Sequence, residues 1–149
     1  MNNPERSEYI NSNTTEEAGV GERVVILLKP GSSEFEERLC DFLQNQELNI
    51  LDRKKLNFDA DTIKKFYPHA DDKFFPNMED YFSQEETIAL LVSGQNAIKI
   101  SNSLKRHVRG ILHLRQPRDG IHVSDDPTEA ERERAVLGLE YNNDGNTLT

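Results

Sequence analysis

The stretch at residues 109–133, R-G-I-L-H-L-R-Q-P-R-D-G-I-H-V-S-D-D-P-T-E-A-E-R-E, decides both the fold and the chemistry. Its pattern predicts a short strand through Ile121 and His122, followed by a helix that carries Glu133. Ser124 and Asp125 stand where such a helix is capped. A histidine beside a strand, with a carboxylate on the next helix, can be held in one orientation. Because neutral imidazole is a good nucleophile near neutral pH, His122 is the candidate nucleophile.

Two cations accompany this histidine in the sequence. Lys29 and Pro30 end an apolar run, and Arg109 precedes His122 by thirteen residues. One nucleophile and two cations suffice to move a phosphoryl group, whose charge needs clamping more than covalent help. Charge alone leaves two interpretations of the basic cluster open, a solvated loop or a local pocket for an anionic ligand. The cluster consists of Lys99, Lys105, Arg106, Arg109, Arg115 and Arg118.

Further short motifs stand in a fixed order along the chain. They are R-V-V-I-L-L-K-P at 23–30, F-Y at 66–67, F-F-P-N-M at 74–78, V-S-G-Q-N-A at 92–97, R-G at 109–110, and I-H-V-S-D-D-P-T-E-A-E-R-E at 121–133. Each motif is weak alone, but all of them in this order are specific. The chain therefore resembles the nucleoside diphosphate kinase family over residues 22–141.

The periodicity predicts an α+β fold. Strands are expected at 24–28, 48–58, 87–92 and around His122, and helices after residue 33 and at 59–67, 74–82, 95–104 and 127–139. Two β-α-β halves of this kind predict a ferredoxin-like, four-stranded antiparallel sheet with helices packed on one face. This arrangement agrees with the fold that the resemblance implies.

Composition predicts one domain between polar ends. The chain has 149 residues, 35% of them hydrophobic, and a mean hydropathy of −0.75. Residues 1–22 and 142–149 are polar and without period, which predicts disordered tails around a domain at 23–141.

Charge and cysteine content exclude several classes of protein. A net charge of −9 and an isoelectric point of about 4.9 argue against general nucleic-acid binding. No apolar run reaches the length of a membrane span, and the first residues lack a signal-peptide pattern. The single cysteine, Cys40, excludes an internal disulfide. We therefore expect a cytoplasmic protein without membrane contact.

The resemblance assigns chemical roles to five residues. It implies that His122 becomes a phosphohistidine, accepting phosphate from a nucleoside triphosphate and returning it to a nucleoside diphosphate. Glu133 would orient the imidazole, and Ser124 would bridge these two, although a helix cap explains Ser124 equally well. Lys29 and Tyr67 would contact the transferred phosphoryl group. Without the resemblance, each of these residues also fits an ordinary packing or surface role.

The resemblance also implies a nucleotide site. Phe74 and Met78 would form the platform and wall for the base, where stacking tolerates different bases. Arg109 would grip a terminal phosphate, and Asp119 and Ser124 would lie beside the nucleotide. Magnesium would ride on the nucleotide phosphates, because no compact metal-ligand motif is present. The remaining histidines and nearby acids, which we expect in exposed loops, are His69, His107, His113, Asp71 and Asp72.

Several positions depart from the pattern of the active family members. Asn102 stands where they carry a phosphate-clamping arginine, Asp119 replaces an asparagine, and Val123 replaces a glycine that follows the histidine. A short loop at 103–108 is expected between a helix and Arg109, and Lys105 or Arg106 is the candidate replacement for the lost cation.

These departures leave two hypotheses open. One is a weak nucleoside diphosphate kinase. The other is an impaired, kinase-like interaction module, a pseudoenzyme. The motif F-F-P-N-M-E-D-Y-F at 74–82 is similar to the branch of the family found in cilia and sperm flagella, which implies axonemal partners. In either case the family implies a homo-oligomer, at least a dimer.

Overall fold

The structure of this protein is a computed structural model that describes residues 21–112 and 120–140, without the side chains of 109–112. The predictions for the polar ends therefore lie largely outside the described residues. In chain order the elements are β1 (Glu22–Leu28), η1 (Ser33–Phe35), α2 (Glu36–Asn45), β2 (Asn49–Leu56), α3 (Ala60–Phe66), η2 (Asp72–Phe74), α4 (Phe75–Phe82), β3 (Thr87–Gly94), α5 (Ala97–Leu112), β4 (Ile121–Val123) and α6 (Pro127–Leu137).

The strands form the predicted sheet. Its four strands lie in the order β2-β3-β1-β4, and each neighbouring pair is antiparallel, which confirms the α+β, ferredoxin-like prediction. β1 is central, and its apolar run is buried throughout residues 24–28. In the register of β1 with β4, Leu27 is the partner of His122 and Leu28 the partner of Ile121. The short β4 strand thus places the candidate nucleophile beside the C-terminal end of β1.

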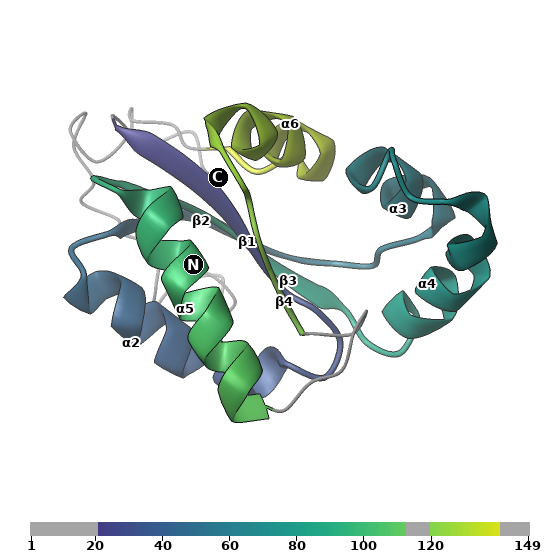
Figure 1. Cartoon of the computed structure of the whole chain (residues 1–149), viewed down its shortest axis with the longest axis horizontal. Helices are drawn as coiled ribbons and strands as arrows, with labels where there is room; N and C mark the ends of the chain where they lie inside the picture. Colours follow the sequence, from purple (N-terminus) through teal and green to yellow (C-terminus); the bar gives the residue numbers. More distant parts are fainter. Residues whose placement is uncertain (1–20, 113–119, 141–149) are drawn as a thin grey trace, which may run out of the picture.

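Helices cover both faces of the sheet, so the prediction of helices on one face was wrong. Figure 1 shows α2 and α5 on one side of the strands and α6 on the other. Val24, Ile26 and Leu28 pack with residues of α2 and α5, whereas Val25 and Leu27 pack with residues of α3, α4 and α6. The physical reason lies in the sequence of β1, because consecutive apolar residues alternate between the faces and both must be covered.

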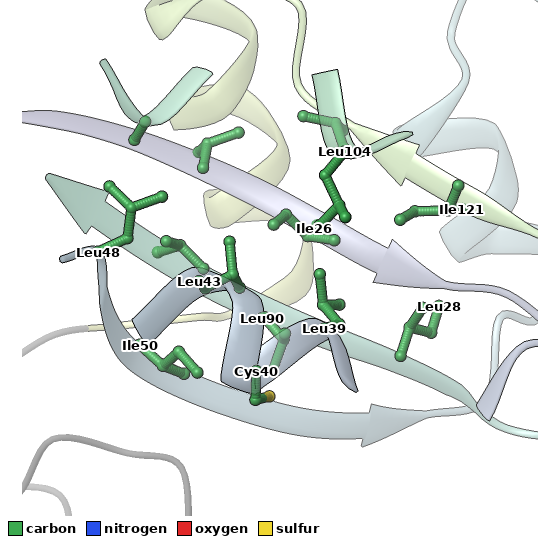
Figure 2. Packing of buried hydrophobic residues seen from close by; sticks show 14 of the residues in the cluster. Ile26, Leu28, Leu39, Cys40, Leu43, Leu48, Ile50, Leu90, Leu104 and Ile121 are labelled. Carbon is green, nitrogen blue, oxygen red and sulfur yellow. The ribbon is translucent and has the colours of Figure 1, made fainter. Parts of the chain in front are cut away.

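The first of these cores is formed largely by aliphatic side chains. Figure 2 shows Ile26 and Leu28 of β1 together with Leu39 and Leu43 of α2 and Leu104 of α5. On the opposite face, the core contains the aromatic residues Phe58, Phe66, Tyr81 and Phe82.

Helix α5 is longer than predicted. It runs to Leu112, so residues 103–108 are helical and the prediction of a loop there was wrong. The apolar spacing explains the extension, because Ile100, Leu104 and Val108 recur every four residues and pack against the first core. Lys99, Lys105 and Arg106 therefore lie on a helix, whereas Arg115 and Arg118 lie outside the described residues.

Helix α6 begins at Pro127 as predicted, but its N-cap lies one residue after the predicted cap at Asp125. Asp126 is the N-cap, and its carboxylate accepts a hydrogen bond from the Glu129 amide at 2.8 Å. The helix ends at Leu137, and its C-cap is Gly138, whose φ of 69° is left-handed and favours glycine. The two ends place Glu133 in the middle of α6, opposite β4.

Candidate active site

His122 lies on the face of the sheet that α3 and α6 cover. Ile121 and Val123 on either side of it are buried in the core that packs against α2 and α5, so alternation along β4 turns His122 the other way. The Phe66 ring lies 5.1 Å from the imidazole between centroids, edge to face, and the Tyr67 ring lies 6.5 Å away. The side chain of Val123, which stands where active family members have a glycine, packs on the opposite face.

Glu133 fixes the orientation of the imidazole. Its Oε2 lies 2.9 Å from Nε2 of His122, and the carboxylate is only 4% exposed. An ionised carboxylate can only accept, so we assign the proton of the neutral imidazole to Nε2. The lone pair then belongs to Nδ1. The geometry therefore makes Nδ1 the candidate nucleophilic nitrogen.

Ser124 forms a hydrogen bond with the carboxylate oxygen of Glu133 that does not contact His122. Its hydroxyl donates to Oε1 of Glu133 at 2.7 Å and accepts a hydrogen bond from the Val25 amide at 2.9 Å. Glu133 therefore bridges Ser124 and His122, and the prediction that Ser124 is the bridge was wrong. Nor is Ser124 the cap of α6, which is Asp126. Because Ser124 is fully buried, its role toward the nucleotide stays a prediction.

Lys29 and Tyr67 converge on the same face as His122. Lys29 follows β1 directly, and its amide donates to the Gly120 carbonyl at 2.8 Å, which continues the pairing with β4. Its Nζ lies 5.9 Å from the centroid of the Tyr67 ring, the same ring that faces His122. The structure thus brings together the three residues that the sequence predicted to meet.

Two residues that the sequence did not reveal hold the turn after Lys29. The hydroxyl of Tyr81 donates to the carbonyl of Pro30 at 2.9 Å. The carboxylate of Glu85 accepts a hydrogen bond from the amide of Gly31, also at 2.9 Å. Nothing in the sequence pattern of Tyr81 or Glu85 indicates this contact, because both partners are main-chain atoms more than fifty residues away.

Phe74 and Met78 lie one helical turn apart at the start of α4. Phe74 is 50% exposed and is the large hydrophobic side chain that stands out at the surface of the described residues. Nζ of Lys73 lies 5.2 Å from the centroid of its ring. Met78 is partly buried against the second core. An exposed aromatic face suits a stacked base, but this role stays a prediction.

The structure describes Asn102, whereas the nucleotide-binding roles of Arg109 and Asp119 stay predictions. The amide nitrogen of Asn102 donates to the carbonyl of Ile98 at 2.9 Å and to that of Ser124 at 3.1 Å, so this side chain ties α5 to the segment after β4. The backbone of Arg109 belongs to α5, but its side chain lies outside the described residues, as does all of Asp119.

Across residues 21–112 and 120–140, no group of three or more His, Cys, Asp or Glu side chains is placed to hold a metal ion. Over the same residues, no helix has the length and apolar character needed to cross a membrane.

Comparison with known proteins identifies the family. The family model for nucleoside diphosphate kinase matches residues 22–138. Nucleoside diphosphate kinase homolog 5 of Mus musculus is 29% identical over 126 residues, which cover 75% of this chain but only 60% of that protein. The nucleoside diphosphate kinase of Methanobrevibacter smithii is 27% identical over 132 residues, or 80% of this chain and 86% of the relative.

Solved structures show the same fold. The crystal structure of the Aquifex aeolicus nucleoside diphosphate kinase matches with a TM-score of 0.68 and 23% identity, covering 81% of this chain and 99% of that one. Family model and fold agree with the order of motifs and with the cluster around His122. The chain belongs to the nucleoside diphosphate kinase family.

Proposed function

We propose that this protein transfers the terminal phosphate of a nucleoside triphosphate to a nucleoside diphosphate, through a phosphohistidine at His122. The observation that carries the proposal is the fixed imidazole, whose Nε2 lies 2.9 Å from the buried Glu133 carboxylate. This contact leaves the lone pair on Nδ1. Lys29 and Tyr67, which lie against each other on the same face, would meet the phosphoryl oxygens.

The reaction would have two symmetrical steps. In the first, the lone pair of Nδ1 forms a bond to the terminal phosphorus while the bond to the bridging oxygen breaks. That oxygen leaves with the electron pair on the nucleoside diphosphate. In the second step, a terminal oxygen of another diphosphate attacks the same phosphorus and Nδ1 departs. Glu133 would offset the positive charge that the imidazole gains, and the Lys29 ammonium would neutralise charge on the phosphoryl oxygens.

Magnesium belongs to this scheme as part of the substrate. Mg²⁺ prefers to keep several waters and to bind nucleotide phosphates with few protein ligands. Its contribution when bound would be to neutralise phosphate charge. The binding of nucleoside di- and triphosphates would otherwise rest on Phe74, Met78, Arg109 and, by family position, Asp119 and Ser124.

We expect a slow enzyme. Asn102 stands where active family members have a phosphate-clamping arginine. The side-chain amide of Asn102 already donates hydrogen bonds to two main-chain carbonyls. A hydrogen bond to a charged group contributes about 1.5–3 kcal/mol, so its absence lowers transfer by roughly ten- to a hundredfold. Lys105 and Arg106 lie one turn further along α5 and are the candidate replacements.

The two hydrogen bonds of Asn102 also favour a second function. A side chain at position 102 that stabilises the fold and does not clamp a phosphate is what we expect in a kinase-like interaction module, a pseudoenzyme. The motif at 74–82, which resembles the ciliary and flagellar branch of the family, would imply a partner in the axoneme of a cilium or flagellum. The enzyme proposal places the chain in the cytoplasm, and both proposals include a homo-oligomer, at least a dimer.

A labelling experiment separates these functions. The full chain is incubated with Mg²⁺ and γ-labelled ATP, then chased with an unlabelled diphosphate. We expect acid-labile label on the wild type and its transfer on chase, and neither in His122→Ala. His69→Ala is the matched control, because His69 is exposed. Equal labelling of His122→Ala would overturn the enzyme proposal. An unlabelled wild type would leave the interaction module.

A further inference from the structure

Arg132 of α6 joins the end of α3 to the candidate active site. Its Nη1 donates to the carbonyl of Lys65 at 2.9 Å, and its Nη2 donates to that of Phe66 at 3.1 Å. Both carbonyls belong to the last turn of α3, where a helix has no amides of its own left to satisfy them. The guanidinium thus caps α3 from a helix that lies 66 residues later in the sequence.

The orientation of this guanidinium is fixed on its own helix. Nε and Nη2 of Arg132 donate to the two carboxylate oxygens of Glu129 at 3.2 and 3.0 Å. The hydrogen bonds from Arg132 hold the pKa of Glu129 below its usual range, and the same contact raises the pKa of Arg132. A charged, two-pronged pair of this kind sets the plane of the fork, which a lysine cannot reproduce.

The cap acts on the two aromatic residues that face His122. Phe66 is the last residue of α3, and Tyr67 follows it, with its amide bonded to the carbonyl of Ile63 at 2.8 Å. Their rings form the wall 5.1 and 6.5 Å from the imidazole. Any movement of the α3 end therefore moves this wall.

Arg132 also reaches the other side of the site. Its Nη2 lies 3.9 Å from Oε2 of Glu133, the same oxygen that contacts His122. One guanidinium thus contacts the helix that carries the aromatic wall and lies beside the carboxylate that orients the imidazole.

We infer that Arg132 is a positioning residue that sets Tyr67 and Phe66 against His122 by capping α3. Its effect on phosphoryl transfer rests on the proposed function, whereas its effect on the α3 end does not. Arg134 provides the matched control. It lies on the same helix and pairs with Glu131 at 2.6 Å, but its other contact is the carbonyl of Leu139, away from His122.

The first measurement is amide hydrogen exchange in the full chain, which needs no activity. We expect Arg132→Gln to speed exchange of the Tyr67 amide at least about tenfold, because its helical bond frays without the cap. Arg134→Gln should leave that amide unchanged. Should Arg132→Gln fold poorly, Arg132→Lys provides a milder variant with an intermediate effect. Unchanged exchange at Tyr67 in folded Arg132→Lys or Arg132→Gln would overturn the inference.

The second measurement is a double-mutant cycle on the rate of phosphohistidine formation. We expect Arg132→Gln to lower the rate about tenfold in the wild-type background, because small misplacements of reacting groups slow a reaction strongly. Arg132→Gln should have little further effect in the Tyr67→Phe background, because Arg132 acts through Tyr67. Additive losses would overturn that part of the inference. If the wild type forms no phosphohistidine, the proposed function fails, and the exchange measurement alone decides on Arg132.

Discussion

Glu133→Gln tests whether the carboxylate acts on His122 through its charge. The amide has almost the same shape, so its oxygen can still accept the hydrogen bond from Nε2 of His122. Its amino group would face the hydroxyl of Ser124, which can accept it and turn its own proton toward the carbonyl of Val25, 3.3 Å away. The substitution therefore removes a negative charge and leaves every hydrogen-bonding group of the cluster with a partner.

The expected loss follows from that charge. A hydrogen bond to a charged group contributes about 1.5–3 kcal/mol, against about 0.5–1.5 kcal/mol between neutral groups. The stabilisation that the carboxylate provides increases as the imidazole gains positive charge. Water screens this interaction poorly, because the carboxylate is only 4% exposed. The difference of about 1–1.5 kcal/mol between the two kinds of hydrogen bond is therefore a lower bound, so we expect phosphohistidine formation to slow by at least about five- to tenfold.

Rapid-quench labelling with γ-labelled ATP gives the rate of the first step directly. Denaturant unfolding of the same variant should show only a small change in the free energy of unfolding. Glu131→Gln is the matched control, since Glu131 lies on the same helix with a side chain that is 63% exposed, and should keep the wild-type rate. A wild-type rate in Glu133→Gln would refute an electrostatic role for Glu133.

Three further predictions follow from the described contacts. Tyr81→Phe should destabilise the chain by about 1 kcal/mol in denaturant unfolding and slow phosphohistidine formation severalfold, because the turn after Lys29 loses its hydroxyl donor. Asn102→Arg with Asp119→Asn should raise kcat/KM in steady-state assays while lowering stability, because Asn102 gives up its bonds to two carbonyls; an unchanged kcat/KM would contradict this. Burial raises the pKa of the Cys40 thiol to about 12 from 9.0, so its contribution to stability is present below pH 9 and is lost as pH rises toward 12. Above pH 9 the wild type should lose up to about 1.4 kcal/mol per pH unit more than Cys40→Ala, and parallel curves would contradict this.

The pairing of His122 with Glu133 could be predicted from sequence because its signals are local, whereas the roles of Lys29 and Tyr67 beside it were implied by the family resemblance. The strand carrying His122 and the helix carrying Glu133 are adjacent in the chain, so their order alone brings the two side chains together. Lys29 ends the one continuous apolar run near the start of the domain, and a central strand of that kind is the natural partner for a short edge strand.

The remaining features depend on contacts between distant main-chain and side-chain atoms. Arg132 looks like a solvated charge on a helix rich in Glu and Arg, because its partners are carbonyls of α3. Asn102 marks a lost phosphate clamp in the sequence, but its bond to the carbonyl of Ser124 needs the packing of α5 against β4. The extension of α5 was missed because its basic residues suggested a loop, whereas the apolar period at 100, 104 and 108 continued through them.

The most direct test of the account is the site of phosphorylation itself. After a single turnover with γ-labelled ATP and Mg²⁺, the label should be acid-labile, stable in base and bound to Nδ1 of His122. Nitrogen-resolved NMR or peptide mass spectrometry of the labelled chain can assign it. Label on Nδ1, absent from His122→Ala, is the result that we predict. Label on Nε2, on another residue, or on none would contradict an imidazole held by Glu133 as the nucleophile.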